Sequence, residues 1–191
     1  MDKVRIGIIG LGNMGTSHAV HITEGKVPRM ELAAICDIAE ARRTYAEEHF
    51  PGVKVFDNAT DMYKSGLLDA VIIAVPHYSH PPLAIEAFSY GLHVMTEKPA
   101  GVYTKQVLEM NEAAKKSGKV FGIMYNQRTN PVYQKIRSMI QRGDLGEIKR
   151  ITWIITNWYR KQSYHDSSAW RSTWKDEGGG TLMTIRLPAE H

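Results

Sequence analysis

The sequence predicts an α/β fold, with a doubly wound parallel sheet followed by the beginning of a second, α+β domain. Short apolar runs alternate with helix-length segments along residues 4–125, a pattern typical of βαβ units. The first apolar run leads into Gly10-Leu11-Gly12-Asn13-Met14-Gly15, and a helical segment follows this loop. A strand, a glycine-rich turn and a helix in this order predict a Rossmann dinucleotide-binding domain.

The expected strands are short apolar runs, as in a parallel sheet that is buried on both faces. They cover residues 4–9, 30–36, 53–56, 70–75, 93–96 and 120–125. Pro76 ends the fourth run, because proline has no amide hydrogen to give to a sheet. The intervening helices are expected at residues 16–24, 38–49, 82–90 and 104–117.

The sequence changes character near residue 126. We place a domain boundary there, between a dinucleotide-binding domain (residues 1–125) and the start of an incomplete second domain (residues 126–191). Asn130-Pro131 predicts the start of a helix, which Gly143 ends. Apolar residues recur along it at helical spacing, namely Val132, Ile136, Met139 and Ile140.

Residues 148–156 are expected to form a strand. A partial second domain of this kind is expected to leave an apolar face exposed.

Composition narrows the class of protein. The 191-residue chain is 43% hydrophobic, and its formal charge of +4 comes without a basic, aromatic-rich patch, which argues against nucleic-acid binding. No apolar run is long enough to span a bilayer, and we identify no signal peptide. The single cysteine, Cys36, lies in an apolar run typical of a buried, inert thiol. These features predict a cytoplasmic protein.

Each glycine of the loop has its own purpose in binding a dinucleotide. Gly10 permits the tight turn, Gly12 lets the backbone approach the pyrophosphate, and Gly15 lets the helix pack closely on the strand. Asn13 and Met14 belong to the loop that opens the helix, and the free amides and positive dipole end of that helix attract phosphates.

Asp37 follows the second strand, about 20 residues beyond the loop. Its carboxylate is placed to accept hydrogen bonds from the adenosine ribose and to repel the extra phosphate of NADP, so NAD is the expected cofactor. Arg42 and Arg43 follow closely and would soften this preference. We therefore count Arg42 among the cofactor-binding residues.

Two further motifs follow the fourth and fifth expected strands, and ligands of open α/β sheets bind beyond such strand ends. The first contains Pro76, His77 and His80, and the second contains Glu97 and Lys98. Lys98 is expected to hydrogen-bond a substrate hydroxyl or to assist proton transfer, the alternative being a surface lysine in a turn. For the two histidines, packing against the cofactor or a strand end is as good an interpretation as catalysis.

These motifs, in this order, resemble the Gfo/Idh/MocA family of oxidoreductases. The resemblance continues through residues 125–131 and 143–148, then Trp158-Tyr159-Arg160, Trp170-Arg171 and residues 177–180. It implies reversible NAD(P)-dependent hydride transfer between nicotinamide and a hydroxyl carbon of a sugar, polyol or derivative. It also implies a homo-oligomer, and we expect no metal ion.

The resemblance assigns roles to individual residues. In the family, the lysine of Glu-Lys-Pro reaches the reacting substrate carbon, a role that maps to Lys98, and the segment with Pro76, His77 and His80 lines the cofactor cleft. Substrate contacts are implied for five residues, which are Arg128, Trp158, Arg160, Trp170 and Arg171. Aromatic faces suit sugar C–H surfaces and arginine binds hydroxyls or carboxylates, but core packing or a subunit interface explains these side chains equally well.

The chain departs from the family near Met183. The family's Asp or Asn and the histidine that serves as its base fall on Thr184 and Pro188, and His191 is out of register. We expect a truncation or a reading-frame change at this point. Three functions remain open: a sugar or polyol dehydrogenase, a dinucleotide-binding module or fragment without turnover, and a glycosidase that oxidises its substrate transiently with NAD.

Overall fold

A parallel sheet organises the computed structural model, which describes residues 3–154, 156, 160–166, 168, 170 and 173–178. Within this part of the chain six strands lie in the order β3-β2-β1-β4-β5-β6. They are β1 (Val4–Ile9), β2 (Met30–Cys36), β3 (Lys54–Phe56), β4 (Ala70–Ile73), β5 (His93–Thr96) and β6 (Phe121–Ile123). The chain starts in the middle of the sheet, winds out to β3, returns to β4 beside β1 and winds out again to β6. The predicted doubly wound Rossmann fold is confirmed.

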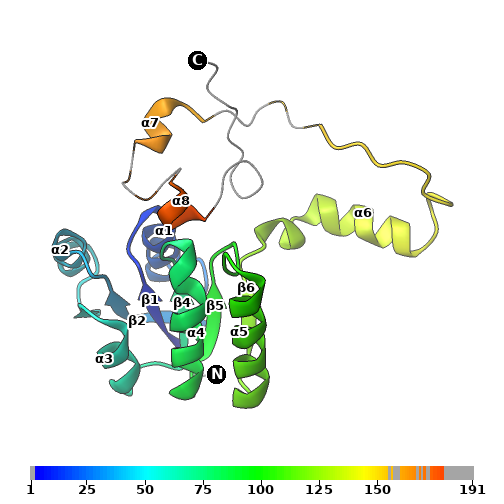
Figure 1. Cartoon of the computed structure of the whole chain (residues 1–191). Helices are drawn as coiled ribbons and strands as arrows, with labels where there is room; N and C mark the ends of the chain where they lie inside the picture. Colours follow the sequence, from blue (N-terminus) through cyan, green and yellow to red (C-terminus); the bar gives the residue numbers. More distant parts are fainter. Residues whose placement is uncertain are drawn as a thin grey trace.

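Helices cover both faces of this sheet (Figure 1). α1 (Asn13–Thr23) and α2 (Glu40–His49) pack on the face to which Ile6 and Ile8 point. α3 (Ala59–Lys64), α4 (His80–Ser89) and α5 (Thr104–Ser117) pack on the other face, against Ile9 and Val71. Neighbouring residues of one strand thus enter opposite cores, because side chains alternate across a strand. Cys36 lies in the second core, and burial raises the pKa of its thiol to about 12.

Two helices differ from the prediction. The helix expected from residue 16 begins at Asn13, directly after Gly12, so the loop itself supplies the first turn. α3 occupies residues to which the sequence analysis assigned no element. Its first turn is capped by Asn58, whose side-chain oxygen accepts a hydrogen bond of 2.8 Å from the Asp61 amide.

The second part of the chain begins with η2 (Asn126–Thr129) and α6 (Pro131–Gln141). Figure 1 shows α6 extending away from the sheet. As predicted, Asn130 caps α6 by accepting a hydrogen bond of 2.9 Å from the Val132 amide, and Gly143 follows its end with a φ of +77°. Two short helices come later, α7 (Gln162–His165) and α8 (Trp174–Glu177).

The predicted strand over residues 148–156 is wrong for the described residues 148–154 and 156, which have no strand structure. A strand requires a neighbour for its backbone amides and carbonyls. No strand of the described part of the chain lies beside this segment.

Apolar side chains of the second part remain exposed, as predicted. We call six of them the apolar set: Val132, Ile136, Ile140, Ile151, Trp153 and Ile154. Trp153 lies against Tyr133 of α6, with 5.7 Å between ring centroids, so the segment around it runs beside this helix. Among the described residues, no helix combines the length and the apolar composition needed to cross a membrane.

Candidate cofactor and active site

The strands end together at one edge of the sheet. Pairing aligns Ile9 with Cys36 and with Ile73, and aligns Ile73 with Thr96. The next residue of each strand therefore stands in one row, which reads Asp37, Gly10, Ala74 and Glu97 across the sheet. The motifs selected from the sequence meet at this row, between α1 on one face and α4 on the other.

The glycine loop closes tightly between β1 and α1. Gly10 has a φ of +88°, and a Cβ there would lie 2.6 Å from the Ala74 carbonyl oxygen. A Cβ at Gly15 would lie 1.8 Å from the Gly10 carbonyl oxygen, so α1 packs on this turn only because residue 15 is glycine. A Cβ at Gly12, in contrast, would meet nothing within 4 Å. Gly12 therefore faces open space.

The first turn of α1 borders this open space. Asn13 and Met14 are exposed there, and no side chain caps the helix. The uncapped amides and the bare backbone at Gly12 form a cradle that fits a pyrophosphate.

Asp37 joins the end of β2 to the glycine loop. Its Oδ2 accepts a hydrogen bond of 2.7 Å from the Leu11 amide, and its Oδ1 accepts one of 2.9 Å from the Ala39 amide. The carboxylate is half-buried, and each oxygen keeps a second lone pair for another donor. Asp37 thus has the place and the remaining capacity to bind a ribose hydroxyl.

The two arginines after Asp37 behave differently. Arg43 directs Nη1 to the carbonyl oxygens of Asp37 and Ile38, at 3.0 and 2.8 Å. Its guanidinium therefore stabilises the backbone that follows β2. Arg42 is exposed and lies on the first turn of α2.

Glu97 holds the turn that carries Lys98. Its Oε1 lies 3.0 Å from His18 Nε2, and its Oε2 accepts a hydrogen bond of 3.2 Å from the Lys98 amide. Burial opposes the charge of Glu97, but the hydrogen bonds from His18 and Lys98 outweigh this effect and lower its pKa. Glu97 is therefore a carboxylate at neutral pH, and His18 donates to it.

Lys98 is exposed at the same edge. Within the described residues its ammonium makes no hydrogen bond or ion pair. It is therefore available to a ligand.

His80 lies fully buried behind this turn, at the start of α4. Its Nδ1 is 2.7 Å from the Pro99 carbonyl oxygen and its Nε2 is 2.8 Å from the Val75 carbonyl oxygen. Burial lowers the pKa of His80, although the two carbonyls and Glu97 favour the charged ring. The ring connects the end of β4 to the Lys98 turn, and packing is the role that these contacts support.

His77 lies in η1 (His77–Ser79), which follows Pro76. Its ring is 5% exposed, and Nδ1 lies 2.9 Å from the Glu177 carbonyl oxygen. Because a carbonyl only accepts, Nδ1 carries the hydrogen, and Nε2 of the neutral ring is an acceptor that makes no hydrogen bond to the residues that the structure describes. Burial lowers the pKa of His77, and the hydrogen bond to the Glu177 carbonyl opposes this shift only in part.

Within the described part of the chain, one of the five predicted substrate residues contacts His77, and this residue is Trp170. Trp170 packs edge-on against His77, with 5.4 Å between ring centroids. Arg160 lies over the Tyr164 ring at 4.5 Å, and Arg128 is exposed in η2 just beyond β6. The remaining predicted positions lie outside the described residues, namely Trp158, Arg171, Thr184, Pro188 and His191.

The amino-acid pattern matches two consecutive parts of one known family. Residues 4–125 match the Gfo/Idh/MocA oxidoreductase family with an NAD-binding Rossmann fold, and residues 133–186 match the C-terminal domain of the same family. The chain belongs to the Gfo/Idh/MocA family. The resemblance drawn from the motifs is confirmed, and the N-terminal part is an NAD-binding Rossmann domain by family.

The relatives of this chain within the Gfo/Idh/MocA family are named for different activities. Inositol 2-dehydrogenase of Corynebacterium glutamicum is 29% identical over 86% of this chain and 49% of its own length. A glycosyl hydrolase family 109 protein of Shewanella baltica is 28% identical over 95% of this chain and 42% of its own length. This chain spans about half the length of the curated relatives it matches.

A solved structure of the family extends the comparison. The WlbA dehydrogenase from Bordetella pertussis, in complex with NADH and UDP-GlcNAcA, is 29% identical, with a TM-score of 0.84. The match covers 95% of this chain and 51% of that one.

One residue of the site in this Gfo/Idh/MocA chain, His18, belongs to none of the motifs selected from the sequence. It lies three positions after Gly15, and residues so spaced share one side of a helix. Because Gly15 must face the sheet to pack on it, His18 faces the sheet too. This spacing was the available signal.

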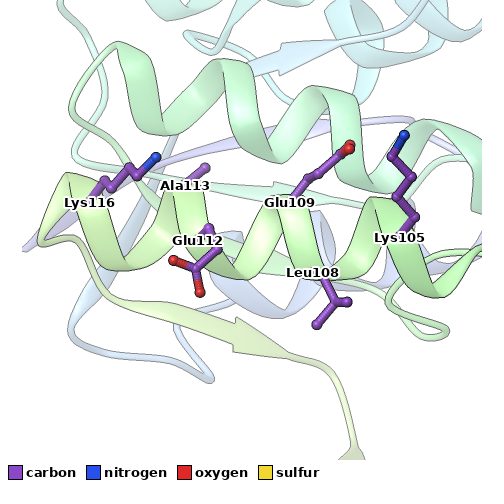
Figure 2. Close-up of a pocket in the computed structure, with 6 residues that line it drawn as sticks. All are labelled: Lys105, Leu108, Glu109, Glu112, Ala113 and Lys116. Carbon is purple, nitrogen blue, oxygen red and sulfur yellow. The ribbon is translucent and has the colours of Figure 1, made fainter.

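A hollow of about 580 Å³ lies along α5 (Figure 2). Its lining comes from α5 alone and consists of Lys105, Leu108, Glu109, Glu112, Ala113 and Lys116. It contains none of the residues that surround the glycine loop or Lys98. We therefore assign it no part in the family's chemistry.

Proposed function

We propose that this chain binds NAD and forms the Rossmann part of a dehydrogenase that acts on a hydroxyl carbon of a sugar, a polyol or a derivative. The observation that carries the proposal is the meeting of an open glycine cradle, Asp37 and Lys98 along one row of strand ends. When bound, the nicotinamide supplies the hydride chemistry. The protein then has to hold the cofactor, orient the substrate and handle one proton.

Cofactor binding is assigned to the glycine cradle and its neighbours. The open side of Gly12 and the uncapped amides of α1 would hold the pyrophosphate. Asp37 would accept hydrogen bonds from the ribose, and its negative charge selects NAD over NADP. We propose residues 1–125 as the cofactor domain and residues 126–191 as part of the substrate domain.

Substrate handling is assigned first to Lys98. An exposed ammonium with three donors beside the cofactor cradle is suited to hydrogen-bond the reacting hydroxyl. The names of the inositol and UDP-sugar relatives support a polyhydroxylated substrate. Trp170, packed on His77, is our candidate among the described aromatic residues for contact with its C–H face.

His77 is our candidate for a proton acceptor. Its Nδ1 hydrogen bond to the Glu177 carbonyl fixes the ring and leaves the Nε2 lone pair for a proton. Its lowered pKa keeps the ring neutral at pH 7, the state that a base requires.

Pairing with a second copy is a further part of the proposal. The exposed apolar set places hydrophobic side chains on α6 and on the segment that contacts it.

A glycosidase that oxidises its substrate transiently is the second candidate. The relative named as a glycosyl hydrolase family 109 protein supports it. The same cradle and Lys98 would serve this reaction, which releases a sugar without net formation of NADH.

Titration of the full chain with NAD and NADP, followed by a screen of polyols and UDP-sugars, tests the proposal. We expect NAD to bind more tightly than NADP and NADH absorbance to rise with a polyol or a UDP-sugar. Sugar release without net NADH would favour the glycosidase, and binding without turnover would favour a dinucleotide-binding module. If a folded sample bound neither cofactor, the proposal would be wrong.

A further inference from the structure

The geometry points to His18 as a positioning residue that couples the phosphate-binding helix α1 to the Lys98 turn through Glu97. The functional meaning of this coupling rests on the proposed function, because it concerns how cofactor binding reaches Lys98. The hydrogen bonds of His18 and Glu97 do not depend on the proposed function.

His18 connects two parts of the site that the backbone does not connect. It belongs to α1, whose first turn borders the cradle at Gly12. Glu97 belongs to the turn after β5, and β4 lies between β5 and the β1 strand that leads into α1. Among the described residues, the 3.0 Å contact from His18 Nε2 to Glu97 Oε1 is the side-chain hydrogen bond that joins α1 to this turn.

The hydrogen bond between His18 and Glu97 is shielded from water, so a movement of one side chain should move the other. Glu97 is 7% exposed and the His18 side chain is 18% exposed, so little water competes for the bond. A buried carboxylate requires donors, and Glu97 has two of them, the His18 ring and the Lys98 amide. A shift of α1 therefore moves the carboxylate, and the carboxylate holds the backbone from which Lys98 projects.

The other side of the turn is held separately. Pro99 is bound through its carbonyl to His80, and the Glu97 amide donates to the Ile73 carbonyl at 2.8 Å. These contacts lead to β4 and α4 rather than to α1. Of the described contacts that position the turn, the one from His18 is thus the contact that a residue of α1 makes to it.

The coupling is tested by NMR on the full chain with ADP as the probe. ADP carries two phosphates for the cradle but has no nicotinamide, so it has no reactive end to place beside Lys98. We expect ADP to shift the amide resonances of Glu97 and Lys98 in the wild type. The shift should be lost in His18→Leu and kept in His18→Gln, which retains an amide donor. If ADP binding and the Lys98 turn are coupled, loss of the coupling contact should also weaken ADP binding. We expect the dissociation constant for ADP to rise about fivefold in His18→Leu, which is the low end of the usual range of coupling between two sites.

His21→Leu is the matched control. His21 lies on the same helix but is exposed, and its Nδ1 contacts the Ser17 carbonyl within α1. This variant should behave as the wild type. If His18→Leu does not fold, Glu97→Gln replaces it, because this change removes the charge that His18 and the Lys98 amide share. A folded His18→Leu or Glu97→Gln with the full wild-type shift at Lys98 would overturn the inference.

Failure of the proposed function gives a different result. If neither ADP nor NAD bound, the proposed function would be wrong. The positioning role of His18 could still be tested in the ligand-free chain. There, His18→Leu should speed hydrogen exchange of the Lys98 amide, whereas His18→Gln and His21→Leu should not. Equal exchange in all four proteins would overturn the positioning role.

Discussion

The Leu11 amide and the Asp37 carboxylate are joined by a hydrogen bond of 2.7 Å, which fixes the glycine loop to the end of β2. Asp37 therefore shapes the cradle in addition to facing the expected ribose. Asp37→Ala should weaken NAD binding by about tenfold or more, because hydrogen bonds to a charged group contribute about 1.5–3 kcal/mol. NADP should lose less affinity, since the repelling charge is gone. Calorimetric titration of both cofactors measures the ratio.

Asp57→Ala is the control for this change. Asp57 follows β3 at the same edge of the sheet and is exposed. Its removal should leave the ratio of NAD to NADP affinity unchanged. An equal change of the ratio in both variants would show that Asp37 has no special contact with the cofactor.

Gly12 and Gly15 should respond to the same substitution in opposite ways. In Gly15→Ala the new Cβ would lie 1.8 Å from the Gly10 carbonyl oxygen, so the turn or the helix must move. We expect a loss of at least about 1–3 kcal/mol in the free energy of unfolding, the usual range for overpacking. In Gly12→Ala the Cβ meets nothing within 4 Å, so stability should change by less than about 1 kcal/mol while NAD binding is lost.

Urea unfolding and NAD titration of these two variants separate folding from binding. A stable Gly15→Ala would contradict the packing role of Gly15. A Gly12→Ala protein that bound NAD as the wild type does would show that the cofactor does not approach the backbone there.

The Rossmann part was predictable because its signals are local. A buried parallel strand is an apolar run, and the structure places β1, β2 and β5 at the predicted residues. The glycine loop was predictable for the same reason, since close contacts within the turn require glycine at Gly10 and Gly15. Even the row of strand ends followed from topology, because parallel strands bring their carboxyl ends to one edge.

The remaining features depend on partners far away in the sequence. Residues 148–154 have the composition of a strand, but a strand forms only beside another, and the described part of the chain offers none. The contact between His18 and Glu97 spans 79 positions and follows from the register of three strands. For His80 the sequence left packing and catalysis equally open, and the structure places both of its nitrogens against backbone carbonyls. Residue type alone does not distinguish these roles.

Lys98 should matter for turnover and little for folding. It is exposed, and its ammonium has no partner in the described part of the chain, so Lys98→Ala should change the free energy of unfolding by less than about 0.5 kcal/mol. Turnover of an active substrate should fall by about 10²–10⁴-fold, the usual contribution of a positioned proton-transfer group. NADH absorbance under saturating NAD measures the rate.

Lys105→Ala serves as the comparison, because Lys105 lies on α5 beside the hollow of Figure 2. It should turn over substrate at the wild-type rate. A Lys98→Ala protein with an unchanged rate would remove Lys98 from the reaction.

Acid should destabilise the fold through His77 and His80. Burial lowers the pKa of both below the value of 6.5 that the unfolded chain is expected to have. Between the folded and unfolded pKa values the unfolded chain binds more protons, so the free energy of unfolding falls as the pH drops below 6.5. Glu97, whose folded pKa is lowered, adds a second loss only as the pH falls below its ordinary value of 4.5.

Urea unfolding between pH 7 and pH 5 measures this dependence. The double variant His77→Asn, His80→Asn should have a smaller slope, because it lacks both titrating rings. His49→Asn, which changes an exposed histidine of α2, should keep the wild-type slope. A wild type equally stable at both pH values would exclude the buried histidines as the cause.

The apolar set should govern association of the chain. Ile151 and Ile154 are 78% and 77% exposed, and exposed apolar runs of this kind drive pairing or aggregation. Ile151→Lys with Ile154→Lys should therefore lower the mass measured by light scattering toward that of one chain. The free energy of unfolding should stay within about 0.5 kcal/mol, since neither side chain is buried. Ile38→Lys is the matched control, because Ile38 is 90% exposed but lies in the Rossmann part of the chain, between β2 and α2. If the wild type were already a single chain in solution, or if Ile38→Lys reduced association equally, the apolar set would have no specific part in pairing.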